Sequence, residues 1–260
     1  MKKTASYLCG ASTVCSVIRA MPGTAAFSEE STQEETEIIT ECEPETEQLF
    51  QCGDYVYKLN EDETAMIVEY TGQEADIEIP AELDGHSVTV IAVQAFSYAE
   101  MNSLTIPENI TTIDSRAFEY CSVKDTFSLP AGISIQSDAF SYAKLPKAVV
   151  IPEEAVIEGD SFSYCTGLET LFAEPGAVLT GDAFSYSRNL LTVVLASGSK
   201  VSEDAFYSCG ALKSIVLAGS VELGAGAFPY CDNASIKAAS EDEYAQLMEE
   251  AMKKAAEAAS

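Results

Sequence analysis

Residues 157–165 read Ile-Glu-Gly-Asp-Ser-Phe-Ser-Tyr-Cys, and residues 179–187 read Leu-Thr-Gly-Asp-Ala-Phe-Ser-Tyr-Ser. The second stretch repeats the pattern of the first after 22 residues. In both, a branched aliphatic residue stands five positions before a Phe, and a Tyr stands two positions after it. A motif that returns at a fixed spacing of this length indicates a chain built from stacked copies of one structural unit.

The repeat occupies most of the chain and forms four columns in one phase. The Phe column is Phe96, Phe118, Phe140, Phe162, Phe184, Phe206 and Phe228. The aliphatic column is Ile91, Ile113, Ile135, Ile157, Leu179, Val201 and Leu223. The Tyr column is Tyr98, Tyr120, Tyr142, Tyr164, Tyr186, Ser208 and Tyr230, and the small residues after it are Ala99, Cys121, Ala143, Cys165, Ser187, Cys209 and Cys231. These columns predict coils whose equivalent side chains stack and bury a common core.

Each coil combines extended segments with turns. Short runs of aliphatic and β-branched residues, such as 190–195 and 214–217, are typical of strands. A Pro closes several of these runs, at Pro107, Pro130 and Pro152, because Pro cannot donate to a strand ladder. The Asp-Ala-Phe stretch that follows is expected to open a turn of helix.

This pattern resembles the BspA-like bacterial leucine-rich repeats, in which Leu-x-x-Ile-x-Leu-Pro is followed by Ile-Gly-x-x-Ala-Phe-x-x-Cys. The matching stretches include residues 168–171, 151–152, 157–165 and 205–209, and the resemblance covers about residues 53–235. The Pro column departs from the family pattern after Pro152. The resemblance implies an extracellular solenoid used for adhesion or protein recognition.

We therefore predict a leucine-rich-repeat-like β solenoid of about seven 22-residue coils, with short parallel strands, short helical turns and a C-terminal capping helix. Composition divides the chain further. The predicted regions are a signal peptide at 1–26, an acidic disordered linker at 27–50, an N-terminal capping segment at 51–94, the leucine-rich repeat solenoid at 95–238 and a C-terminal helix at 239–260.

The two ends of the chain have contrasting compositions. Lys2 and Lys3 precede a largely apolar stretch, as in a secretory leader, and residues 28–48 hold nine Glu and no basic residue, which favours disorder. Residues 241–259 are rich in Ala, Glu, Lys and Met, which favours helix. We expect this helix to cover the open end of the solenoid, and a partner-binding helix is the alternative.

Charge and hydropathy restrict partner and location. The formal net charge is -28, so the chain repels phosphate backbones and nucleic acid is excluded as a partner. No run of about 20 apolar residues follows the leader, so no transmembrane segment is expected. The expected location is secreted, or on the extracellular cell surface, of a bacterium.

Few residues suggest catalysis or cofactor binding. His86 is the one His, and the chain has no Gly-x-Ser-x-Gly, no His-Glu-x-x-His and no phosphate-binding Gly loop. We therefore predict no enzymatic activity, no cofactor and neither catalytic nor metal-binding residues.

Two further columns leave alternatives open. Asp138, Asp160, Asp182 and Asp204 stand two residues before Phe; they are predicted to cap the helical turns, and stacked carboxylates that bind Ca²⁺ are the alternative. The Cys column also accepts Ala, which favours small buried thiols. Disulfides between Cys209 and Cys231, or Cys42 and Cys52, stay open.

A candidate binding site follows from strand alternation. If Val149 and Leu171 point inward, their neighbours point outward. The outward residues form an apolar stripe beside Thr residues: Val150, Phe172, Val194, Val216, Thr170 and Thr192. Exposed apolar surface of this kind marks interaction sites, although β propensity alone, or a covering C-terminal helix, would also account for it.

The stripe predicts a binding or adhesion module that recognises a protein or glycan through the strand face. The alternative is an architectural spacer that associates with copies of itself and has no external ligand. A homo-oligomer is therefore left open.

Overall fold

The computed structural model describes residues 47–259, and their side chains as far as Lys254. The chain divides into two units at Leu49, and the fold is that of the second unit, Phe50–Ser260. The predicted signal peptide, and the predicted linker as far as Thr46, lie outside the described residues. The other domain boundaries given above stay predictions.

The solenoid begins with an antiparallel segment. The strands of this segment are β1 (Phe50–Cys52), β2 (Tyr55–Leu59), β3 (Ala65–Tyr70), β5 (Glu82–Leu83) and β6 (His86–Ile91). β1, β2 and β3 pair antiparallel, whereas β3 pairs parallel with β6. The Tyr70 ring stacks on Phe96 with centroids 5.1 Å apart, so the segment covers the first ring of the Phe column.

From β6 onward one sheet grows by a short parallel strand per coil. These strands are β8 (Thr112–Ile113), β10 (Ser134–Ile135), β12 (Val156–Ile157), β14 (Val178–Leu179), β16 (Lys200–Val201) and β18 (Glu222–Leu223). Ile135 lies opposite Ile113 and Ile157, which is the 22-residue register. The predicted aliphatic column is therefore confirmed as a strand ladder.

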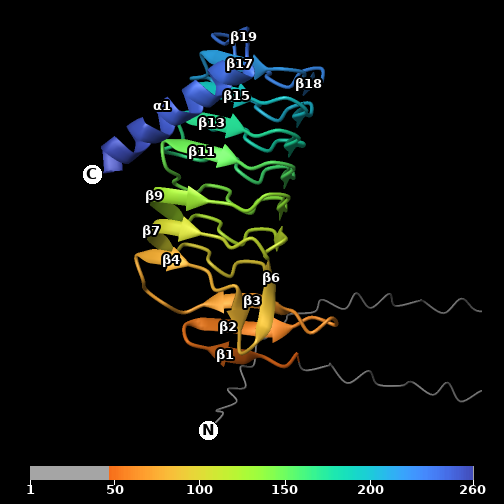
Figure 1. Ribbon diagram of the computed structural model, residues 1–260, viewed down its shortest axis with the longest axis vertical. Coiled ribbons are helices and arrows are strands. Elements are labelled where there is room, and N and C mark those ends of the chain that lie inside the picture. The colour runs from red at the N-terminus through yellow and green to blue at the C-terminus, as the bar shows by residue number, and fades with distance from the viewer. Residues whose placement is uncertain (1–46, 260) are drawn as a thin grey trace, which may run out of the picture. The chain divides into compact units, whose positions relative to one another are not determined.

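The opposite side of each coil carries longer parallel strands in two sheets (Figure 1). The first contains β4 (Asp76–Glu78), β7 (Glu100–Thr105) and β9 (Ser122–Ser128). The second contains β11 (Ala148–Ile151), β13 (Thr170–Ala173), β15 (Thr192–Leu195), β17 (Ser214–Ala218) and β19 (Ser235–Ala239). Pro146 lies just before β11, between the two sheets, and has no N–H to donate to a ladder.

The Phe column forms the centre of the core. Successive rings from Phe96 to Phe228 stack with centroids 4.8 to 5.4 Å apart. The rings of Phe118, Phe140, Phe162, Phe184 and Phe206 are completely buried. This spacing matches the distance of about 4.8 Å between hydrogen-bonded strands, so ring stacking and strand pairing reinforce each other. The predicted solenoid is confirmed.

The segment around each Phe is a series of turns, not a helix. Ser141 N donates to Asp138 O and Ala143 N donates to Phe140 O, both across three residues. Asp138, Asp160 and Asp204 have φ of 63°, 51° and 64°. An N-cap residue has extended backbone instead, so the prediction that these Asp residues cap helical turns is wrong. Asp tolerates the left-handed conformation that the coil requires here.

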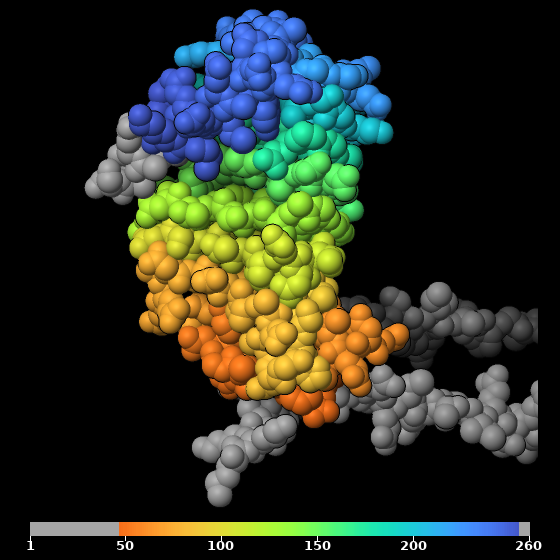
Figure 2. Space-filling model, viewed as in Figure 1, coloured from red at the N-terminus to blue at the C-terminus, as the bar shows by residue number. Residues whose placement is uncertain are grey.

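α1 (Glu241–Ala259) is the helix of the described residues, and it begins with a capping box. Ser240 Oγ accepts from Glu243 N at 3.2 Å, and Glu243 Oε2 accepts from Ser240 N at 2.8 Å. The helix crosses the face of the β11–β19 sheet and does not cover the end of the solenoid (Figures 1 and 2). The expectation that the helix covers the open end was wrong. The apolar side of a helix packs where apolar surface is available, and here that surface is the face of the sheet.

Phe162→Ala should lower the free energy of unfolding by about 3 to 5 kcal/mol, because it opens a cavity in the middle of the ring stack. Denaturant unfolding followed by circular dichroism measures the change. Thr166→Ala, an exposed site in the same coil, is the control and should stay within about 0.5 kcal/mol of the parent chain. Equal stability of the two variants would contradict a core built on this stack.

Candidate binding surface

The six predicted site residues lie on one face of the β11–β19 sheet, in two adjacent columns. Val150, Phe172, Val194 and Val216 are opposite one another across successive strands, and Thr170 lies opposite Thr192. The intervening residues Val149, Leu171, Val193 and Ile215 are buried in the core. Alternation along each strand thus separates a core face from an outer face, as the sequence indicated.

The apolar column on the outer face is covered by α1. Phe172 and Val216 are 1% exposed and Val194 is fully buried, in a second apolar cluster separate from the Phe core. The helix contributes Tyr244, Leu247, Met248 and Ala251 to this cluster. Figure 2 shows the helix atoms lying directly on the coils beneath. The expectation of an exposed apolar stripe is therefore wrong, because covering it removes the apolar area from water.

Tyr244 anchors the helix to the sheet. Its ring meets the Phe172 ring edge-on with centroids 6.1 Å apart, and its hydroxyl donates to the Ala173 carbonyl at 3.4 Å. Burial, with a smaller contribution from the carboxylate of Glu174, raises the pKa of Tyr244 well above its usual value. The side chain is therefore a neutral phenol whose hydroxyl is satisfied inside the interface.

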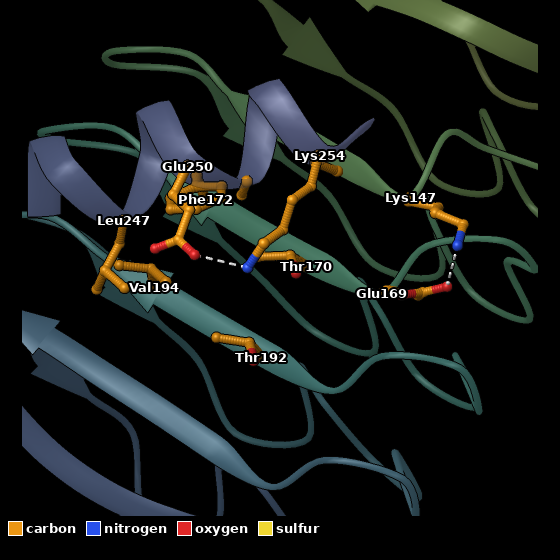
Figure 3. Close-up of a pocket in the computed structure, with 11 residues that line it drawn as sticks. Lys147, Glu169, Thr170, Phe172, Thr192, Val194, Leu247, Glu250 and Lys254 are labelled. Carbon is orange, nitrogen blue, oxygen red and sulfur yellow. Dashed lines mark hydrogen bonds and ion pairs between the residues drawn. The ribbon is translucent and has the colours of Figure 1, made fainter. Parts of the chain in front are cut away.

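Beside the helix the outer face stays open and forms a groove of about 350 Å³ (Figure 3). Thr170 and Thr192 are half-buried residues on neighbouring strands, the half-buried Leu247 and Ala251 of α1 supply the accessible apolar lining, and the buried Phe172 and Val194 lie beneath it. Four of the six predicted residues line this groove; Val150 and Val216 do not.

Two ion pairs stand at the rim of the groove. Lys147 Nζ lies 3.2 Å from Glu169 Oε1, and Lys254 Nζ lies 2.6 Å from Glu250 Oε1 (Figure 3). All four side chains are more than 40% exposed, so these pairs add little stability and can exchange partners with a ligand. A groove with hydroxyls, charges of both signs and an apolar floor can hold a sugar or a short peptide segment.

The other candidate residues lie away from this groove. Within residues 47–259 the carboxylates, thiols and His86 form no cluster of three that could hold a metal ion. His86 Nδ1 lies 2.8 Å from the Glu63 carbonyl oxygen, near the N-terminal end of the solenoid.

The cysteines of the repeat are buried thiols. Cys209 Sγ donates to the Phe184 carbonyl at 3.2 Å and Cys231 Sγ donates to the Phe206 carbonyl at 3.3 Å, so these two residues form no disulfide. Burial raises the pKa of Cys121 and of Cys209 to about 12, which keeps both protonated and unreactive. The pairing of Cys42 with Cys52 falls partly outside the described residues.

Sequence reasoning missed the charged rim and the anchor. Lys147 and Glu169 are 22 residues apart and stand just before the adjacent strands β11 and β13, so the repeat itself placed them side by side and this signal was available. Glu250 and Lys254 are four residues apart on one helix, but their position beside the groove depends on where the helix docks. No sequence signal connected Tyr244 with Phe172.

The chain belongs to the BspA type leucine rich repeat region family. The family's repeat pattern matches residues 76–169 and 157–235, in six copies. A search of curated proteins found no match. Among residues 47–259, no helix has the length and apolar character needed to cross a bilayer.

Three solved structures are similar to the chain. A leucine rich repeat protein of T. pallidum is 21% identical, with a TM-score of 0.53, over 77% of this chain and 92% of that one. A leucine-rich repeat protein of Bacteroides capillosus is 24% identical, with a TM-score of 0.40, over 48% and 98%. A leucine rich cell surface protein of Faecalibacterium prausnitzii is 16% identical, with a TM-score of 0.30, over 77% and 97%. The first of these supports the solenoid fold.

Tyr244→Ala should release α1 from the sheet, because it removes both the ring contact with Phe172 and the hydrogen bond to Ala173. Hydrogen exchange of the α1 amides should accelerate at least tenfold, about 1.4 kcal/mol of lost protection. Met252→Ala, an exposed position on the same helix, should leave the exchange unchanged. Unchanged exchange in the Tyr244 variant would show that the helix is held elsewhere.

Proposed function

We propose that this chain is a binding protein, secreted or displayed on the extracellular surface of a bacterium, that recognises a protein or glycan through the groove beside α1. The groove carries the proposal. It combines two hydroxyls on adjacent strands, two exchangeable ion pairs and an apolar floor. Such a mixture supplies the orientation and the contact area that ligand recognition needs. The leader-like residues at the N-terminus support export.

Binding without catalysis is the simplest use of this surface. Thr170 and Thr192 have aliphatic and charged neighbours, and His86, the one His of the chain, lies near Glu63 and not among the groove residues. Neither hydroxyl therefore has an imidazole base within reach. The ligand would be held by hydrogen bonds and by the charged rim.

Thr192→Trp should abolish retention of the purified chain on intact host or bacterial cells, because the indole fills the groove. The chain contains no Trp, so the fluorescence of the new indole also reports whether it is buried. Thr111→Trp, at an exposed site just before β8 in the sheet of short strands, is the control and should bind as the parent chain does. Undiminished retention of the Thr192 variant, with its indole buried, would refute binding through the groove.

A second candidate function is architectural, with copies of the chain associating end to end. β19 is the last strand of its sheet. Its outer edge is unpaired among the described residues, because α1 lies on the sheet face and not over this edge. Ile236 on this strand is 58% exposed. A free edge with an exposed aliphatic side chain can accept a further strand.

Ile236→Lys should convert an oligomer of the parent chain to monomer, because the added charge blocks strand pairing at the free edge. Light scattering coupled to size exclusion measures the mass. Met252→Lys introduces the same charge at an exposed position on α1 and should leave the mass unchanged. A parent chain that is monomeric at all accessible concentrations would exclude the architectural role.

A further inference from the structure

A second exposed surface, distinct from the groove, is formed by the tyrosine column. We call Tyr98, Tyr120, Tyr142, Tyr164 and Tyr186 the tyrosine ladder. Successive rings stack with centroids 4.6 to 5.0 Å apart and planes inclined by 7° to 14°. Exposure falls from 69% at Tyr98 to 38% at Tyr164, so the ladder is a continuous aromatic strip at the protein surface.

The fold does not need aromatic side chains in this column. Ser208 occupies the same position of its coil with φ of 56°, close to the 56° to 61° of the five tyrosines. This left-handed conformation costs a residue other than Gly about 1 to 2 kcal/mol. The backbone accepts that cost because each N–H donates to the next coil, as Tyr142 N does to Ser163 O at 2.9 Å. Large exposed rings at positions suited to Gly indicate selection for a surface property.

The column of aspartates runs beside the ladder. Asp160 O accepts a hydrogen bond from Ser163 N at 3.0 Å, so each aspartate of this kind lies in the same tight turn as the tyrosine of its coil. Arg116 pairs with Asp138 at 3.7 Å. Asp160, Asp182 and Asp204 form no salt bridge with any residue of the described part of the chain. Arg188 also lies close enough to the Tyr164 hydroxyl to act on it electrostatically, so a cation is accommodated beside the ladder. Stacked like charges repel one another, and a cationic partner that neutralises them is favoured.

The ring geometry distinguishes a basic peptide from a glycan. A sugar binds an aromatic side chain by stacking on its face, but the faces inside the ladder are occupied by the neighbouring tyrosines. What remains accessible is a row of ring edges and hydroxyl groups. The aliphatic part of a Lys or Arg side chain can lie along such a row while its charged end reaches the aspartates. The net charge of -28 would steer a basic segment toward this surface.

We propose that the tyrosine ladder and the adjacent aspartate column form a docking surface for a basic segment of a partner protein. The aromatic strip supplies contact area, since Tyr buries large area at small entropic cost, and the carboxylates supply selectivity for cations. This surface lies at the turns of the coils and shares no residue with the groove, so either site can exist without the other.

The test measures binding of the full chain to a short fluorescent peptide of alternating Arg and Ser by polarisation. Tyr142→Ser combined with Tyr164→Ser copies the residue that naturally stands at Ser208, and should weaken binding about tenfold. Asp160→Asn combined with Asp182→Asn should weaken it to a similar degree. Asn tolerates the left-handed backbone of Asp160, so this second pair tests the surface even if the Ser pair unfolds.

The matched control is Glu78→Gln combined with Asp125→Asn, which also removes two negative charges, from exposed positions on β4 and β9. It should bind the peptide as the parent chain does. If the control pair weakened binding as much as the Asp160 and Asp182 pair does, only net charge would matter and the proposal would be overturned. Undiminished peptide binding by the folded Ser pair, or tyrosine-dependent retention of a neutral linear glucan in place of the peptide, would also overturn it.

Discussion

The structure depends on one constraint, the equality between the spacing of stacked aromatic rings and the spacing of hydrogen-bonded strands. Both are close to 4.8 Å, so a Phe at every twenty-second residue can lie on the Phe of the coil before it while both coils keep their backbone pairing. Strand pairing alone does not fix the coil length, since β19 pairs with β17 at an offset of 21 residues; the unbroken column from Phe96 to Phe228 holds it at 22. Because every coil satisfies the same constraint, the outer columns come into register without requiring any contact of their own.

This register explains why the surface of the solenoid is organised in rows. The strand residues of the groove, the tyrosine ladder and the aspartate column are each sets of equivalent positions that recur in the 22-residue register of the core. Surface chemistry can therefore change from one column to the next while the fold is kept, as Ser208 in the tyrosine column illustrates. A repeat solenoid of this kind suits recognition of extended partners, since each row offers the same group several times.

The docking of α1 gives the otherwise repetitive strand face a unique site. By covering Phe172, Val194 and Val216, the helix removes the most apolar outer surface from water and leaves a groove along its side. The same docking leaves β19 as a free edge, since a helix on the face cannot also cover the end. The position of one helix thus decides both where the groove forms and that the edge of β19 stays open.

The sequence alone determined the solenoid, its 22-residue register, its Phe core and the outer face that carries Thr170 and Thr192, because all of these follow from periodicity and strand alternation. The conformation of the aspartate turns was predicted wrongly from the sequence, because an Asp such as Asp138 can adopt either extended or left-handed backbone and the sequence pattern does not distinguish them. Only the tertiary structure decided where α1 lies. An amphipathic helix joined to a solenoid could pack on its end or its face, and the choice rests on contacts such as Tyr244 with Phe172, 72 residues away in the chain, that no local pattern encodes.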